Sequence, residues 1–140
     1  MIAPDTSVLV AGFIPSHGFH PEAVSVLVEV KAEGSLVAHT IAETYSVLTS
    51  PSGPYRVEPT AVAAYLDQFL DRAGPVQPRP SSYREAIGLL GERNRTGGAV
   101  YDALIALAAR DAELTLASLD RRAERTYAAC GVEAKMLLPA

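Results

Sequence analysis

The stretch from Gly97 to Asp120, GGAVYDALIALAARDAELTLASLD, guides the interpretation of the whole chain. After its opening glycine pair, residues 99–109 are apolar around the whole helical circumference except at Tyr101 and Asp102, and such a helix is typically buried. No cation lies three or four positions from Asp102 in either direction. A buried carboxylate without a partner protonates, pairs with a distant group or coordinates a metal. The sequence therefore predicts that other parts of the chain meet Asp102.

The length and composition indicate one globular domain over residues 1–140, with 49% hydrophobic residues. No apolar run approaches the ~20 residues of a membrane span, so no membrane association is expected. The first residues lack the basic region of a secretory signal. The single cysteine, Cys130, forms no intramolecular disulfide and is expected to be a buried packing residue. We therefore expect a cytoplasmic protein.

The formal net charge of −4 argues against a simple basic nucleic-acid-binding protein. All the basic residues except Lys31 and Lys135 are arginines, whose planar guanidinium groups match phosphate oxygens. The same arginine bias can also reflect genome composition. If four acids form a cation-binding cluster, the remaining acidic and basic residues balance, so net charge alone does not decide the function.

Short strands alternate with helices along the chain. Strands are predicted at residues 1–4, 36–38, 114–117 and 132–138, with a brief one near Val76. Helices are predicted at residues 6–13, 22–33, 40–50, 60–72, 81–93, 99–109 and 121–130. This alternation favours βαβ units and an α/β fold, with a short, mostly parallel sheet of four to five strands and helices on both faces.

Four acids from distant parts of the chain are expected at one edge of this sheet, because ligands bind beyond the carboxyl ends of parallel strands. Asp5 follows the first strand, and Glu43 lies in the first turn of the helix after the second. Asp120 follows the strand that leaves the Asp102 helix. Four carboxylates in one pocket repel one another unless a cation lies among them. Ligation by oxygens alone suits Mg²⁺ or Mn²⁺ rather than zinc.

Three of the four acids also have a purely structural explanation. Asp5 and Asp120 precede helices and could be N-caps. Thr40 and Glu43 match the spacing of a capping box, in which the glutamate bonds back to the amide of the cap. Asp102 lies inside its helix, so capping does not explain it. The joint pattern therefore favours a metal site over four independent caps.

The residues around the acids add little further chemistry. Ser7 and Ser118 lie two positions from Asp5 and Asp120, where a hydroxyl could orient a carboxylate or support a metal. The three histidines form no recognisable pair of metal ligands, and no glycine-rich phosphate loop indicates a nucleotide cofactor.

Four short motifs together resemble those of the PIN-domain ribonucleases. They are IAPDTS at residues 2–7, HTIAE at 39–43, GGAVYDALIALAA at 97–109 and LASLDRRA at 116–123. The chain length and the order of the motifs resemble the VapC-type toxins of bacterial toxin–antitoxin pairs, and the resemblance runs from Ile2 to about Leu138.

The resemblance implies a PIN-like three-layer α/β/α sandwich, homodimerisation and inhibition by a small cognate antitoxin. It also implies an endoribonuclease that uses Mg²⁺ or Mn²⁺ and an activated water to cut RNA, leaving 5′-phosphate and 3′-hydroxyl ends. The four acids of the family, catalytic and metal-binding, fall on Asp5, Glu43, Asp102 and Asp120. The hydroxyls that accompany the first and fourth acids fall on Ser7 and Ser118.

RNA affinity is expected from arginines near the pocket mouth, and Arg95, Arg121 and Arg122 are placed best by the sequence. Each of them could equally lie on a solvated helix face. No motif distinguishes transfer RNA, ribosomal RNA and messenger RNA as substrates.

Three other interpretations remain. A catalytically weak PIN-like module would bind RNA or protein without cutting, although such a domain is expected to have lost at least one acid. A metal-dependent enzyme acting on a small phosphorylated molecule would place a pair of acids after the first strand, where Asp5 stands alone. A structural cluster of helix caps would gain no stability from divalent ions.

Overall fold

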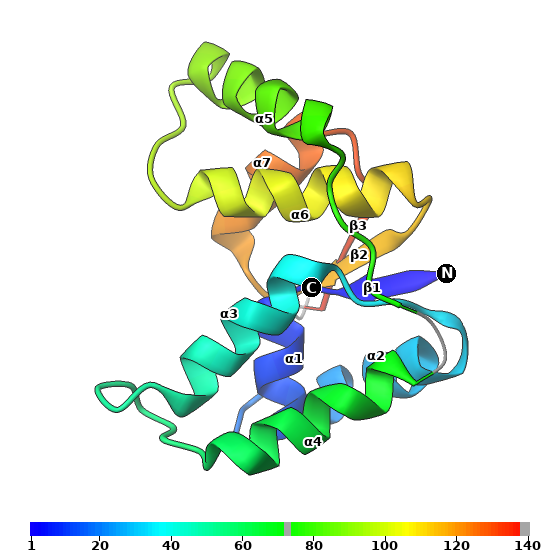
Figure 1. Cartoon of the computed structure of the whole chain (residues 1–140), viewed down its shortest axis with the longest axis vertical. Coiled ribbons are helices and arrows are strands. Elements are labelled where there is room, and N and C mark those ends of the chain that lie inside the picture. Colours follow the sequence, from blue (N-terminus) through cyan, green and yellow to red (C-terminus); the bar gives the residue numbers. More distant parts are fainter. Residues whose placement is uncertain (72–73, 138–140) are drawn as a thin grey trace.

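The computed structural model of the protein describes residues 1–71 and 74–137 (Figure 1). All the predicted helices form, and their ends differ from the predicted ones by at most two residues. Arg72, at the end of the fourth predicted helix, and Leu138, at the end of the last predicted strand, lie outside the described residues. The elements are β1 (Ile2–Pro4), α1 (Thr6–Phe13), α2 (His20–Glu33), α3 (Ala38–Thr49), α4 (Pro59–Leu70), α5 (Pro80–Glu92), α6 (Ala99–Asp111), β2 (Thr115–Ser118), α7 (Arg121–Ala129) and β3 (Ala134–Met136).

The sheet of the described residues is parallel, as expected, with the strand order β1–β2–β3. Its three strands are fewer than the four to five predicted. The two predicted strands near residues 37 and 76 reduce to one parallel bridge between Val37 and Val76. Pairing extends no further because Ala38 already begins α3. The predicted last strand is likewise shorter, at Ala134–Met136.

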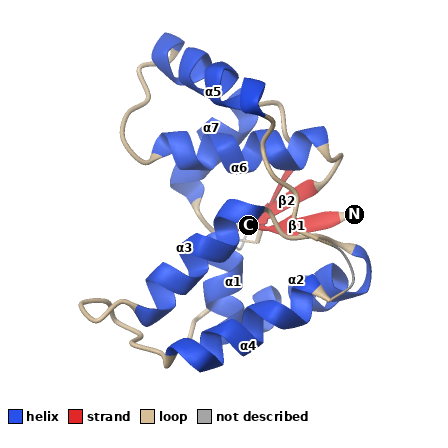
Figure 2. Cartoon of the chain, in the orientation of Figure 1, coloured by secondary structure: helices blue, strands red, loops and turns tan. Residues whose placement is uncertain are grey.

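Helices pack on both sides of the strands, which confirms the α/β/α arrangement (Figures 1 and 2). Figure 1 shows α5, α6 and α7 above the strands and α1 to α4 below them. Successive strand residues contribute to different core clusters, because side chains alternate across a sheet. Ala3 and Leu116 belong to the cluster built on α6, whereas Ile2 and Ala117 belong to the one built on α1 and α2. In the described part of the chain, no helix is long and apolar enough to span a membrane.

The α6 helix is buried from Ala103 to Ala109, as its composition predicts. Its first turn emerges from the core, however, so Tyr101 is 49% exposed and Asp102 is half-buried. The expectation of a fully buried Asp102 is therefore corrected: the helix presents this carboxylate at the edge of the core.

A close backbone contact places α2 against β1 at Gly34. Gly34 caps α2, and its N–H donates to the Val30 carbonyl at 2.8 Å. The next amide, that of Ser35, donates to the Ile2 carbonyl at 3.2 Å. A Cβ atom at position 34 would overlap the Ile2 carbonyl oxygen and lie 2.8 Å from the Val30 Cα. Both are backbone atoms, so the position requires glycine.

We expect the Gly34→Ala substitution to lower the free energy of unfolding by about 2 kcal/mol, because the added methyl group forces β1 and α2 apart. Gly88→Ala in α5 is the matched control, since a Cβ there meets nothing within 4 Å. The control is expected to raise stability by up to about 1 kcal/mol, through better helix propensity. Urea denaturation measures both, and equal effects would contradict the close-contact argument.

Candidate active site

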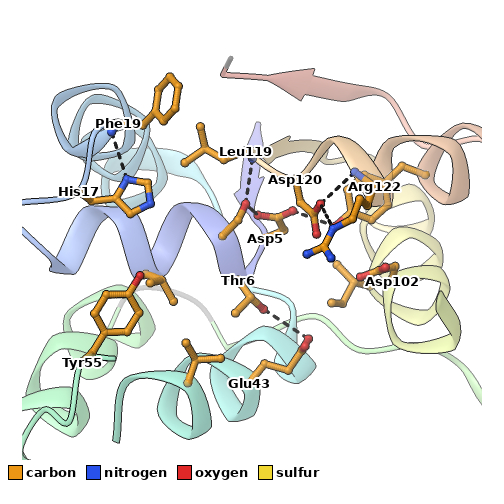
Figure 3. Close-up of a pocket in the computed structure, with 15 residues that line it drawn as sticks. Asp5, Thr6, His17, Phe19, Glu43, Tyr55, Asp102, Leu119, Asp120 and Arg122 are labelled. Atoms are coloured by element: carbon orange, nitrogen blue, oxygen red, sulfur yellow. Dashed lines mark hydrogen bonds and ion pairs between the residues drawn. The ribbon is translucent and has the colours of Figure 1, made fainter. Parts of the chain in front are cut away.

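An open pocket of about 490 Å³ lies beyond the carboxyl ends of β1 and β2. All four predicted acids line it, and they reach it from different elements, as Figure 3 shows. The four acids therefore converge, as the sequence predicts. The four acids are Asp5, Glu43, Asp102 and Asp120.

Asp5 is the most deeply buried of the four, with 3% of its surface exposed. It is the N-cap of α1 and accepts a hydrogen bond from the Val8 N–H at 3.3 Å. The Ser7 hydroxyl donates to Asp5 Oδ1, and the Tyr127 hydroxyl donates to Oδ2 at 2.8 Å. Burial raises the pKa of Asp5, and hydrogen bonds from Ser118, Ser7 and Tyr127 partly offset this rise.

Asp102 extends from the first turn of α6 toward the other acids. Burial, followed by the charges of Asp120, Glu43 and Asp5, raises its pKa to about 6, while Arg95 acts in the opposite direction. Repulsion from three neighbouring carboxylates thus adds to the loss of solvation at Asp102.

Glu43 reaches the pocket from α3, and its capping-box explanation is wrong. The helix begins at Ala38, two residues before Thr40, and the Thr40 hydroxyl donates to the Val37 carbonyl at 2.7 Å. Glu43 is therefore not used to cap α3. Its Oε1 accepts a hydrogen bond from the Thr6 hydroxyl at 3.3 Å and lies 3.4 Å from His39 Nε2.

Asp120 is the N-cap of α7 and accepts from the Arg122 N–H at 2.9 Å. The two predicted serines hold the segment that leads to it. Ser7 accepts from the Leu119 N–H at 2.9 Å, and Ser118 accepts from the Asp120 N–H at 3.0 Å. Ser7 thus connects the ends of β1 and β2, and Ser118 fixes the turn that leads to Asp120.

The three predicted arginines are placed differently. Arg122 lines the pocket, with its side chain 94% exposed and its Nε 3.6 Å from Asp120 Oδ1. The Arg95 guanidinium donates to the Arg122 carbonyl at 3.2 Å and to the Thr126 hydroxyl at 3.0 Å, and so holds the loop before α6 against α7. Arg121 is exposed at the start of α7, outside the pocket lining.

Sequence reasoning missed two residues that hold acids in place. Tyr127 is 1% exposed and is separated from Asp5 by 122 positions, so no local pattern connects the two. Thr6 lies within the quoted IAPDTS motif, but nothing in the motif indicates that its hydroxyl bonds to Glu43.

The donor set suits a hard divalent cation, since the four acids offer oxygen ligands only. Within residues 1–71 and 74–137, however, no three His, Cys, Asp or Glu side chains already form a ready-made metal cage. Glu43 and Asp120 bond to other partners, but their side chains are 35% and 36% exposed, so both have room to turn. The site therefore matches such an ion in chemistry, and coordination would require these two side chains to reorient.

Comparison with known proteins identifies the family of the chain. The PIN domain family matches residues 2–129. The chain is 43% identical over 137 residues to Ribonuclease VapC40 of Mycobacterium tuberculosis, covering 98% of this chain and 99% of that protein. It is 37% identical over 131 residues to Ribonuclease VapC27 of the same species, covering 94% and 93%.

The fold is also found in solved structures. A chain in the crystal structure of FitAcB from Neisseria gonorrhoeae superposes with a TM-score of 0.69 at 21% identity, covering 96% of both chains. A chain in the structure of FitAB bound to the IR36 DNA fragment superposes equally well, at 0.69 and 20% identity, covering 97% of this chain and 94% of that one. The PIN domain match and the similarity to two VapC ribonucleases over almost its whole length show that the chain belongs to the PIN-domain family and, within it, to the VapC type.

Proposed function

We propose that this protein is the toxin of a toxin–antitoxin pair, a metal-dependent endoribonuclease that cleaves structured cellular RNA. The single observation that carries the proposal is the convergence of four carboxylates in one pocket at the carboxyl edge of a parallel sheet. Its membership of the VapC type supports RNA as the substrate. The RNA class, whether transfer, ribosomal or messenger RNA, stays open.

Asp5, Glu43, Asp102 and Asp120 would hold one or two Mg²⁺ or Mn²⁺ ions, which lower the pKa of water and neutralise charge on a phosphodiester. The residues around them supply positioning. Ser7 and Tyr127 fix both oxygens of Asp5, so that its carboxylate has one orientation. Asp102 accepts no hydrogen bond within the described residues, which leaves its carboxylate available to orient a water molecule and accept its proton. Asp120 is the other candidate for this role.

Phosphate contacts would come from the exposed start of α7. Arg122 lies at the pocket, and Arg121 is exposed beside it, so both can reach a backbone that enters the site. Arg95 is already bonded to α7, and we propose that it mainly orders this surface while adding positive charge.

A small antitoxin would be the protein partner, and a homodimer the assembled form. An apolar groove of about 240 Å³ between α1, α2 and α4 offers surface for such contacts. Val24 and Val28 of α2 line it and are 38% and 65% exposed. The cytoplasm remains the predicted location.

The first test is cleavage of total cellular RNA by the purified, antitoxin-free protein in Mg²⁺, Mn²⁺ or EDTA. We expect discrete fragments with either metal and none in EDTA. Asp5→Asn and Asp102→Asn are each expected to reduce the rate by a factor of about 100 or more, because each removes a charged ligand. Asp67→Asn, on the exposed face of α4, is the matched control and should cut like the wild type. Mapping the fragment ends would identify the substrate.

Identical patterns for wild type and variants in every buffer would exclude these acids as the catalytic centre. Metal-independent binding of RNA without any cleavage would instead favour the alternative, a catalytically weak PIN-like module.

The raised pKa of Asp102 makes a second prediction, for stability. Its folded-state pKa of about 6 exceeds the ordinary 3.8, so the folded chain binds more protons than the unfolded chain between these values. Stability is therefore lost as the pH rises through this range, and the whole penalty is present above pH ~6. We expect Asp102→Asn to raise the free energy of unfolding in EDTA at neutral pH by on the order of 1 kcal/mol, a value already reduced for the partial exposure of the group.

The gain should shrink as the pH is lowered and vanish below pH ~3, where Asp102 is protonated in both states. In Mg²⁺ the wild type should become more stable than Asp102→Asn, because the ion stabilises the wild type more than the variant. Urea denaturation with and without Mg²⁺ measures this, again with Asp67→Asn as control. An Asp102→Asn variant that gains nothing in EDTA would contradict the repulsion described here.

A further inference from the structure

Two aromatic rings stack beside the acid pocket and are not used by the proposed chemistry. The rings of His39 in α3 and Tyr101 in α6 have centroids 5.0 Å apart and planes inclined by 8°. His39 Nε2 lies 3.4 Å from Glu43 Oε1, and Tyr101 directly precedes Asp102 in the chain. The pair therefore joins the two elements that carry these acids and lies at the edge of the pocket rather than in its lining.

The pair has the geometry of a surface on which a flat ring can stack. The other aromatic pairs found in residues 1–71 and 74–137 meet edge-on or tilted, with interplanar angles of 50° to 87°. Tyr101 keeps 49% of its surface exposed even though His39 lies against it. A large aromatic ring that is half exposed at the end of an otherwise buried helix is available to a third ring.

The charges around the pocket favour a contact with RNA that does not depend on charge. Four carboxylates face the site, and Arg122 is the only arginine or lysine in its lining within the described residues. Arg95 is occupied by the Arg122 carbonyl and Thr126. With Arg121 and Arg122 as the arginines within reach of the backbone, an RNA strand gains from a further contribution that does not depend on charge. Stacking of an unpaired base on an aromatic side chain provides one and tolerates every base.

We propose that His39 and Tyr101 form a stacking platform for an unpaired nucleobase next to the phosphodiester that is cut. The proposal rests on the proposed function and adds a feature of the substrate: one nucleotide beside the cleavage site is single-stranded and is held by its base. Tyr101 contacts the base, and His39 supports the ring of Tyr101 from the opposite face.

A purely structural role for the pair has different consequences. If the stack only fixes α3 against α6, its loss displaces Glu43 relative to Asp102 and lowers kcat, whichever bases the RNA carries. A platform instead sets KM, and its contribution disappears when the stacked base is absent. These two readouts separate the roles.

The test uses a short synthetic RNA that spans a cleavage site mapped in total RNA. A series of versions makes each nucleotide near the cut abasic in turn. The proteins are wild type, Tyr101→Leu, Tyr101→Phe and Tyr83→Leu. Tyr101→Phe keeps an aromatic ring, and Tyr83→Leu is the matched control because Tyr83 is similarly exposed (52%) but lies on α5, outside the pocket lining.

Tyr101→Leu is expected to raise KM roughly tenfold, within the range measured for base–aromatic contacts, with a smaller change in kcat. Tyr101→Phe and Tyr83→Leu should stay close to wild type. At one position the abasic RNA should raise the wild-type KM by a similar factor and leave the Tyr101→Leu KM unchanged, because the same contact is already lost.

The platform is overturned if every abasic RNA affects wild type and Tyr101→Leu equally. It is also overturned if Tyr101→Leu lowers kcat alone, or if Tyr101→Phe is as impaired as Tyr101→Leu. These failures leave the nuclease intact, since the wild type still cuts. If the wild type cuts no RNA in either metal, the proposed function is wrong, and the proposed platform is then wrong as well.

Discussion

The hydrogen-bonded burial of Asp5 is the constraint on which the rest of the site depends. A carboxylate 3% exposed is costly unless its oxygens have partners, and here those partners come from both ends of the chain. Ser7 of α1 and Tyr127 of α7 donate hydrogen bonds to the two oxygens. The same Ser7 hydroxyl accepts a hydrogen bond from the Leu119 N–H. Forming the bottom of the pocket therefore requires β1, β2 and α7 to assemble together. The other three acids lie around this fixed point on more exposed side chains.

The carboxylates that line the pocket lower the stability of the folded chain. Asp102 lies near three other carboxylates and accepts no compensating hydrogen bond in the described structure, so the folded chain tolerates repulsion that a neutral residue would remove. The buried apolar run of α6, from Ala103 to Ala109, anchors the helix strongly enough to hold that charge in place. Strain of this kind is expected where a site is prepared for a ligand that is not part of the chain.

Much of this arrangement could be predicted from the sequence, because it follows from local periodicity. The helices, the parallel strands and the convergence of four acids at one sheet edge depend on spacing along the chain and on the rule for parallel sheets. The errors came from contacts between distant segments. The α3 helix begins at Ala38, directly after the bridge of Val37 to Val76, and this early start removes the capping box at Thr40. No pattern near Tyr127 indicated its bond to Asp5, and none near Gly34 indicated the close approach of Ile2.

Two of the four acids serve the backbone as well as the pocket. Asp5 and Asp120 cap α1 and α7, whereas Glu43 and Asp102 cap nothing. Removal of either cap costs helix stability of about 1 kcal/mol whether or not the protein cuts RNA. A relative that had lost its activity would thus still be under selection to keep aspartate, or another capping residue, at the positions of Asp5 and Asp120. It would be free to lose the other two acids, and at the position of Asp102 it would even gain stability. If the four acids form the catalytic centre, a change at Glu43 or Asp102 therefore says more about loss of activity than the retention of aspartate at the two caps.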